Sequence, residues 1–433
     1  MQSIQKLGKR LLQSGQYLLF YLLQGIIFII EKTYAIASFL WKKLRKTQTR
    51  SPKTSTFLFT PKQLFKKLSY HEIAALSLLI LCLLFMGLFF VPAKAIFEGN
   101  LIVEEVSFTY NGESDRLFLN TIRNLQRIEL EGQQSLILLG QFESQENPEF
   151  ADTEILEINL NYPDSKLIIE PINLEDSSSL GLEKLYLPSQ SNIRHLTYDA
   201  RSNQLDFTLE TQNPPELEAE EDLDFSIESP LQLSVSDTPL RIVLEGYQFP
   251  ALENASEEYN IIEFTWIPLI SELYLSLPNL AKFNITLPEL NQTNSSEWFW
   301  GKLAVTDVQF YRTLETENVP EKLQISTILK GTVRSLKEEL ELKANQFPIF
   351  KENQGIDRFP HIRIHPDDPP GLEIRIHGTA SQIAAGLDRD FPVGEIQANL
   401  LKRWLPEDLI NVLLTFCAVA IGYLVPWLFT QKS

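Results

Sequence analysis

Three of the five histidines lie close together near the C-terminal end of the chain, on two segments that alternate polar and apolar residues. Residues 361–365 and 372–377 are predicted to form two strands joined by a turn. If their apolar residues share one face, the opposite face carries Glu373 and five basic residues: His361, Arg363, His365, Arg375 and His377. Such a face could bind an anion, or gain charge at about pH 6 to 7, where imidazoles titrate.

The alternative for this hairpin is a solvated outer face on which Arg363 and Glu373 form an ordinary cross-strand ion pair. Metal binding is disfavoured, because two guanidinium groups would repel a cation. We name the five basic residues as candidates for ligand binding. Because of the two guanidinium groups, we expect no metal ion at this face.

The rest of the sequence offers no recognisable catalytic motif. It contains no phosphate-binding loop, no His-Glu-x-x-His zinc helix and no Gly-x-Ser-x-Gly nucleophile elbow. Six of the nine residues 216–224 are acidic, but this run lacks the glycine and the alternating aspartates of a calcium loop. We assign no catalytic residue and no cofactor. A hydrolase of unknown type stays open, since two of the many carboxylates could meet in the fold.

The elements that position these residues are predicted to be strands, because the hydrophobic period between residues 98 and 405 is two. Alternating runs separated by turn residues occur at residues 128–142, 195–210 and 231–244. A short helical piece is possible at residues 335–342. We expect a mainly β domain of the sandwich or barrel type. Its charge distribution suggests an acidic subdomain at residues 98–297 and a near-neutral one at residues 298–405.

Two long uncharged segments flank this region, at residues 73–93 and 409–430. A helix needs roughly 20 residues to cross a hydrocarbon core of about 30 Å, so both segments are long enough to span a membrane. We therefore expect two transmembrane helices that hold the β region between them.

The charge distribution predicts the orientation of these spans. Residues 1–72 contain 13 Lys or Arg and two acids, a net charge of +11, whereas residues 98–405 sum to −29. Basic flanks stay on the cytoplasmic side. Both termini are therefore expected in the cytoplasm, with residues 98–405 on the other side. A charge of −29 also argues against nucleic acid as a partner of this domain.

Residues 1–46 have a narrow polar stripe and a broad apolar side at helical spacing, which is typical of an amphipathic helix in the membrane surface. The alternative is a third span across residues 17–40. Residues 47–72 are predicted to be a basic linker. Aromatic and basic residues suited to the membrane interface follow this helix and precede the second span: Trp41, Lys42, Lys43, Arg45, Lys46 and Trp404.

The chain has two cysteines, Cys82 and Cys417, and both fall inside the expected spans. The exported region therefore carries no disulfide, which favours a bacterial-type inner membrane with a periplasm-like compartment. We expect a non-enzymatic envelope protein, a scaffold or accessory subunit, with membrane lipids and a protein partner. Handling of a lipid or another apolar ligand is the alternative. The sequence predicts no oligomeric state.

Overall fold

The computed structural model describes residues 70–145, 148–173, 180–211, 230–236, 238–250, 261–288, 298–314, 323–351 and 355–430. The chain divides into two compact units, Met1–Ala74 and Ala75–Ser433. The amphipathic helix predicted at residues 1–46 and nearly all of the linker predicted at residues 47–72 lie outside the described residues. The second unit holds the whole described β-domain and most of the described helices.

The longer helices coincide with the two uncharged segments. Helix α3 covers Tyr70–Phe89 and helix α5 covers Glu407–Thr430, with the short α4 at Leu400–Trp404 before it. Among the described residues, α5 alone is long and apolar enough to cross a membrane, over Glu407–Trp427, while the apolar part of α3 is shorter, Ala74–Phe89. Helix α3 stops four residues before the end of the predicted segment 73–93, because Pro92 lacks an amide hydrogen and its backbone enters a β-bridge.

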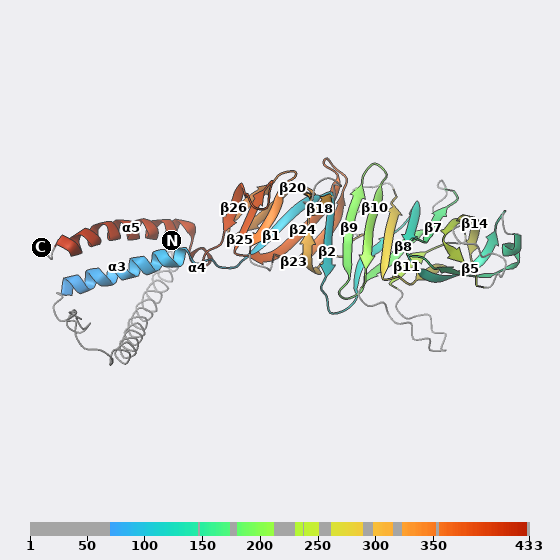
Figure 1. Ribbon diagram of the computed structural model, residues 1–433, viewed down its shortest axis with the longest axis horizontal. Coiled ribbons are helices and arrows are strands. Elements are labelled where there is room, and N and C mark those ends of the chain that lie inside the picture. Colours follow the sequence, from blue (N-terminus) through green and yellow to red (C-terminus); the bar gives the residue numbers. More distant parts are fainter. Residues whose placement is uncertain are drawn as a thin grey trace, which may run out of the picture. The chain divides into compact units, whose positions relative to one another are not determined.

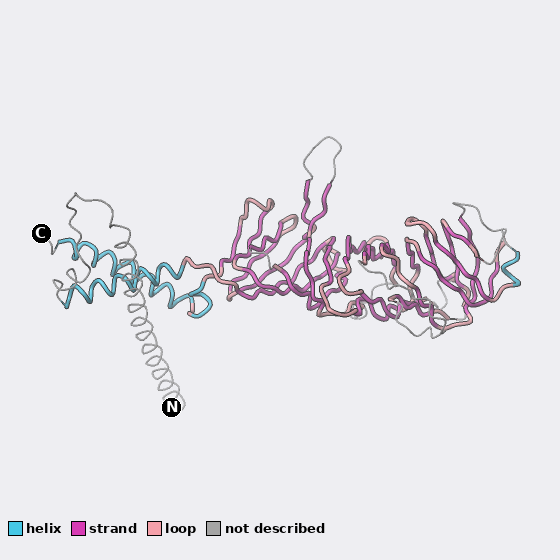
Figure 2. The backbone as a smooth tube through the Cα atoms, turned by 60° about the horizontal axis from the view of Figure 1, so that its bottom comes forward, coloured by secondary structure: helices cyan, strands magenta, loops and turns pink. Residues whose placement is uncertain are grey.

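The β-domain is built on one antiparallel sheet of 17 strands, shown in Figures 1 and 2. Its ladders give one linear order of neighbours. That order is β21 (Glu338–Leu342), β20 (Ile328–Ser335), β1 (Ala95–Val103), β24 (Gly371–Ala380), β23 (Ile356–His365), β17 (Leu303–Gln309), β2 (Glu105–Tyr110), β9 (Asn192–Asp199), β10 (Gln204–Glu210), β16 (Leu280–Thr286), β4 (Arg127–Glu131), β7 (Lys166–Pro171), β12 (Leu240–Glu245), β14 (Ile261–Pro268), β5 (Gln134–Glu143), β6 (Ile155–Leu160) and β13 (Tyr247–Gln248).

The far end of this sheet curls back on itself. Strand β13 continues β12 after Gly246 and pairs with β6, while β12 itself pairs with β7 and β14. The bend needs glycine, because Gly246 has a φ of +67°. Ser165 supports the bend from inside the domain, since its hydroxyl donates to the Gly246 carbonyl oxygen at 2.6 Å.

A second layer covers one face of the main sheet. It contains a four-stranded sheet and a three-stranded sheet, and a separate hairpin is formed by β18 and β19. The four-stranded sheet has the order β15 (Glu272–Leu275), β11 (Leu231–Ser234), β8 (Gly181–Leu187) and β3 (Arg116–Ile122). The other elements are β22 (Phe347–Lys351), β25 (Gln382–Gly386), β26 (Gly394–Gln397), β18 (Tyr311–Leu314), β19 (Leu323–Ser326) and the 3₁₀-helix η1 (Pro148–Asp152).

Alternation along the strands fills the space between the two layers. Strand β10, for example, buries Leu205, Phe207 and Leu209 and turns the residues between them outward. Aromatic rings join the layers. Phe118 of β3 contacts Phe108 of β2 and Phe207 of β10, with ring centroids 6.4 and 5.9 Å apart. One continuous core therefore extends through both of the predicted subdomains, whose division stays a prediction.

The chain enters and leaves the β-domain at one place. Pro92, just after α3, forms an antiparallel bridge with Asn399, just before α4. Two further backbone hydrogen bonds join the same segments, from the amide of Ala93 to the carbonyl of Ala398 and from the amide of Leu400 to the carbonyl of Val91. The end of α3 and the start of the α4–α5 segment are thus held side by side.

One local detail differs from the sequence-based expectations. Residues 335–342 are not helical, because Leu336 and Lys337 adopt φ of +51° and +72° and turn β20 back into β21. The alternating runs expected at residues 128–142, 195–210 and 231–244 are confirmed as strands β4 and β5, β9 and β10, and β11 and β12. Strands β9 and β10 pair with each other as a hairpin, whereas β4 and β5 do not pair and β11 and β12 lie in different sheets.

Candidate functional site

The polar hairpin predicted from the histidines is formed by β23 and β24. His361 lies opposite Arg375, and Arg363 lies opposite Glu373. The intervening apolar residues of both strands are buried: Ile362, Ile364, Leu372, Ile374 and Ile376. All five candidate residues, including His365 and His377, therefore lie on the outer face, with Arg363 and Arg375 exposed and the three histidines half-buried.

Most charge on this face is already paired. Glu373 accepts hydrogen bonds from Arg363 and, at 2.7 Å, from the Asn100 amide of β1. Burial raises the pKa of Glu373, but these two hydrogen bonds outweigh it and hold the pKa below its usual value. His377 Nδ1 lies 3.0 Å from Asp357 Oδ1. The Arg363–Glu373 pair matches the alternative reading of the hairpin, and anion binding stays a prediction.

His361 titrates differently from a free imidazole. Its own burial, followed by the nearby positive charge of Arg363, lowers its pKa. At neutral pH it is therefore uncharged. The face is less cationic than its five basic residues imply, and His361 gains its charge at a lower pH than a free imidazole.

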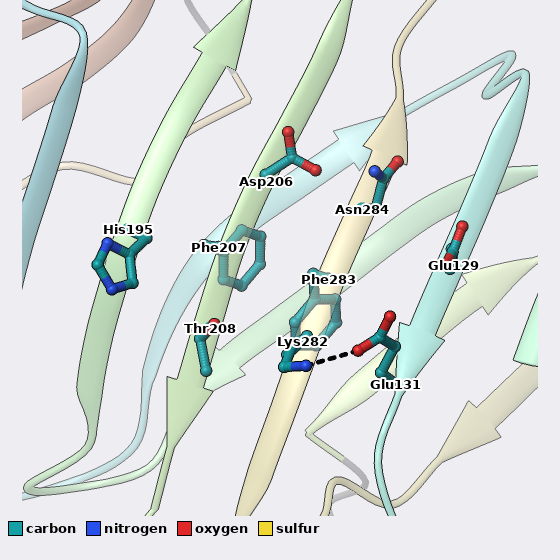
Figure 3. Close-up of a pocket in the computed structure, with 9 residues that line it drawn as sticks. All are labelled: Glu129, Glu131, His195, Asp206, Phe207, Thr208, Lys282, Phe283 and Asn284. Atoms are coloured by element: carbon teal, nitrogen blue, oxygen red, sulfur yellow. Dashed lines mark hydrogen bonds and ion pairs between the residues drawn. The ribbon is translucent and has the colours of Figure 1, made fainter. Parts of the chain in front are cut away.

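A polar groove lies further along the main sheet, on the outer face of β9, β10, β16 and β4 (Figure 3). It encloses about 220 Å³, and the stacked rings of Phe207 and Phe283 lie beneath it, with centroids 4.5 Å apart. Its polar lining comes from four strands: Glu129, Glu131, His195, Asp206, Thr208, Lys282 and Asn284. Its volume is below the roughly 300–1,000 Å³ typical of pockets for drug-sized ligands.

One side of the groove is an ion-pair network. Glu131 contacts Lys282 at 2.7 Å, as Figure 3 shows, and Lys166 of β7 at 3.0 Å. Burial raises the pKa of Glu131, but its hydrogen bonds with the two lysines outweigh burial and lower the pKa overall. The pKa of Lys166 is raised, chiefly by its hydrogen bond with Glu131. These side chains satisfy one another and stabilise the charged forms.

The middle of the groove contains two polar groups, Asp206 and Asn284, beside Glu129, which is paired with Arg127 at 2.8 Å. Asp206, Asn284 and Glu129 lie opposite one another on three neighbouring strands. The Asn284 Oδ1 atom is buried and has no hydrogen-bond partner among the described residues. The pKa of Asp206 is raised, first by burial and then by the negative charges of Asp199 and Glu129. The ionised Asp206 therefore costs stability at neutral pH.

Replacing Asp206 with asparagine is expected to raise the free energy of unfolding at pH 7. The folded pKa of Asp206 lies above its unfolded value, so the folded state disfavours the charged form once the pH exceeds the folded pKa. The gain should shrink as the pH falls towards about 4, where the unfolded aspartate is half protonated, and should disappear at a pH below both pKa values. Urea unfolding of the detergent-solubilised full-length protein at pH 7 and pH 4 measures this difference.

Asp199→Asn is the matched control, because it removes a neighbouring carboxylate whose pKa is shifted the other way. Hydrogen bonds from the Arg201 amide and the Ser202 hydroxyl lower the pKa of Asp199. This variant should lose stability at pH 7. If both variants changed the free energy of unfolding in the same direction at pH 7, the environments assigned to Asp206 and Asp199 would be contradicted.

At the groove edge, His195 is held in an unusual conformation. Its φ of +54° places it in the left-handed region at a β-bulge, where the β9–β10 and β9–β2 registers both shift. Its Nδ1 lies 2.6 Å from Oε1 of Glu105, whose side chain is largely buried on β2. Bulges and left-handed non-glycine residues are enriched at functional sites.

This pairing leaves the second ring nitrogen of His195 available to a ligand. A carboxylate on Nδ1 fixes the orientation of the ring, which is the arrangement that proteins use to position an imidazole. The groove can thus offer hydrogen-bond acceptors from Asp206 and Glu129 together with an oriented imidazole. Among the described residues, no group of three or more His, Cys, Asp or Glu side chains is arranged to hold a metal ion.

The interface anchors fall into two groups. Trp41, Lys42, Lys43, Arg45 and Lys46 lie outside the described residues. Trp404 is the last residue of α4 and is 74% exposed, and the Arg403 guanidinium lies 5.8 Å from its ring centroid. An exposed tryptophan next to a basic residue at the start of an apolar helix is typical of a membrane interface.

Comparison with protein-family models, with curated proteins and with solved structures gives no significant match. The functional argument therefore rests on the residues of this chain.

Proposed function

We propose that this protein is a two-span membrane protein that holds its β-domain on the non-cytoplasmic side of a bacterial-type inner membrane. There the domain serves as a non-enzymatic scaffold or accessory subunit for a protein partner. Helices α3 and α5 are the two spans in this proposal, and both termini are cytoplasmic.

The observation that carries the proposal is the joined entry and exit of the β-domain. The bridge between Pro92 and Asn399 brings the end of α3 next to the segment that leads into α5. Two apolar helices that leave a domain at one point can both enter one bilayer, with the domain on one side of it. Such a pair needs no rearrangement of the β-domain.

The charge distribution supports the orientation. The net charge of +11 before α3 favours the cytoplasm, while the acidic β-domain has no positive charge excess to retain it there. The proposed surface helix at residues 1–46 would add contacts with anionic lipid, at about 1 kcal/mol for each basic residue near the surface.

The β-domain suits partner binding away from the membrane. From β1, next to the helices, to β13 there are fourteen strand-to-strand steps. At about 4.8 Å each, they give a path of about 67 Å along the sheet. The polar groove lies on this path at β9, β10, β16 and β4.

Handling of an apolar ligand gains no support from the described part of the domain. The space between the layers is filled by its own side chains, many of them with no exposed surface. The described groove has a polar lining.

Site-specific photo-crosslinking in the native membrane tests the scaffold proposal. A photoreactive amino acid is placed at Thr208 in the groove or at Arg375 on the hairpin face. The control position is Lys184, an exposed residue of β8 in the second layer. A discrete protein adduct from the groove or hairpin position, and none from Lys184, supports the proposal. Absence of an adduct from both test positions, or a hydrolase activity of the purified protein, contradicts it.

A further inference from the structure

Each of the two apolar helices buries a cysteine although its neighbouring residues are exposed. Cys82 of α3 is 1% exposed, whereas the next residue, Leu83, is 53% exposed. Cys417 of α5 is 5% exposed, whereas the preceding residue, Phe416, is 54% exposed. The burial is therefore specific to one face of each helix.

The second buried residue of each helix lies on the same face. Ala75 precedes Cys82 by seven residues, and Ile410 precedes Cys417 by seven residues. Seven residues make about two helical turns, so each pair lines one side of its helix.

The connections at the membrane-facing end of the β-domain make the two helices antiparallel. Both leave the β-domain at the Pro92–Asn399 bridge, and Figure 1 shows α3 and α5 at the same end of the β-domain. Cys82 lies seven residues before Phe89, the end of α3, which is about 10 Å along the helix. Cys417 lies ten residues after Glu407, the start of α5, which is about 15 Å. The two cysteines are thus at similar depths.

The two thiols meet at this depth. Both thiols are buried and free, and they lie close enough to interact with each other. They are also the only cysteines in the sequence. A pair of thiols in contact can form a disulfide after a small movement, to an S–S distance of about 2.05 Å.

We propose that Cys82 and Cys417 form a redox-sensitive pair that cross-links α3 to α5 within the membrane. Oxidation joins the two sulfurs and releases two protons and two electrons. A quinone dissolved in the bilayer takes up both and becomes a quinol. Reduction by a dithiol reverses the reaction. The two oxidation states differ in whether the spans are covalently joined.

Thiol counting in membranes tests this pair. Membranes that contain the reduced full-length protein are treated with copper(II)–phenanthroline in air, or with a fully ring-substituted benzoquinone that cannot add thiols. The protein is then denatured and labelled with a polyethylene glycol maleimide. The expected result is a fall from two labelled thiols to none, in a monomer on a non-reducing gel, and full recovery with dithiothreitol.

The C82S/L83C variant is the matched control, because it keeps two thiols but moves one to the neighbouring exposed position. It should retain both labels under the same treatment. Two remaining thiols in the unmodified protein, a disulfide-linked dimer, or equal closure of the control would overturn the proposed pair. Disulfide formation with copper but not with the benzoquinone would exclude a quinone as the oxidant.

The location of the thiol pair in a membrane rests on the proposed two-span anchoring. The cross-link and the anchoring can nevertheless be rejected independently of each other. Closure depends on the contact between α3 and α5, whereas the anchoring depends on which side of the membrane each segment faces. A closed pair with the wrong sidedness rejects the anchoring alone. Correct sidedness with an open pair rejects the cross-link alone.

Discussion

Replacing Phe118 with alanine is expected to lower the free energy of unfolding by about 3–5 kcal/mol, the usual cost of removing a buried phenylalanine. Phe118 has no exposed surface and contacts Phe108, Phe207 and Phe299. These contacts join the second layer to the main sheet. The loss would therefore appear as a lower urea midpoint in the detergent-solubilised full-length protein, followed by the β signal in circular dichroism.

Phe391→Ala is the matched control for this substitution. Phe391 is 74% exposed between β25 and β26, so the same change in side-chain size should alter stability by less than about 0.5 kcal/mol. Similar losses for both variants would mean that Phe118 does not connect the layers as described.

The second large effect is expected in α5. Arginines at Phe416 and Val419, which are 54% and 68% exposed near the middle of the helix, should prevent α5 from spanning. Arginine at the centre of a membrane helix costs about 2.5–3.5 kcal/mol, so two arginines cost roughly 5–7 kcal/mol. Protease treatment of intact spheroplasts should then remove a C-terminal tag that is protected in the unmodified protein.

The same positions changed to leucine form the control, because leucine keeps the helix apolar. The F416L/V419L tag should stay protected. If the helix instead lies in water, exposed arginines would change stability by no more than about 0.5 kcal/mol each and would not move the tag. A protected tag in the arginine variant would therefore contradict a membrane location of α5.

The class of the fold could be predicted from the sequence because alternation is a local signal. In β10 and in the β23–β24 hairpin, the residues expected to face inward are buried. The positions of α3 and α5 could be predicted in the same way, from the length and composition of the two uncharged segments.

Strand pairing could not be predicted, since it depends on contacts between distant parts of the chain. Residues 128–142 form strand, turn and strand as expected, but the pairing of β4 with β16 and β7 has no local signal. The failure at residues 335–342 has a local cause. Leu336 and Lys337 adopt positive φ without glycine or asparagine, the usual signal for such a turn.

The same difference between local signals and long-range contacts separates the hairpin face from the groove. The hairpin residues lie within 17 positions of one another, from His361 to His377, so periodicity alone placed them on one face. The groove combines His195 and Asp206 of the β9–β10 hairpin with Glu129 and Asn284, which lie far from that hairpin and from each other in the sequence. Its strongest signal, the left-handed His195 paired with the buried Glu105, has no sequence signature.

The sidedness of three positions tests the two-span anchoring most directly. Single cysteines are introduced by Ser51→Cys, Phe391→Cys or Lys432→Cys in a C82S/C417S background, and intact spheroplasts are treated with a membrane-impermeant maleimide. We expect labelling at position 391 before permeabilisation, and labelling at positions 51 and 432 only afterwards. Labelling of either terminal position from outside, or protection of position 391, would contradict a β-domain held between two spans on the non-cytoplasmic side.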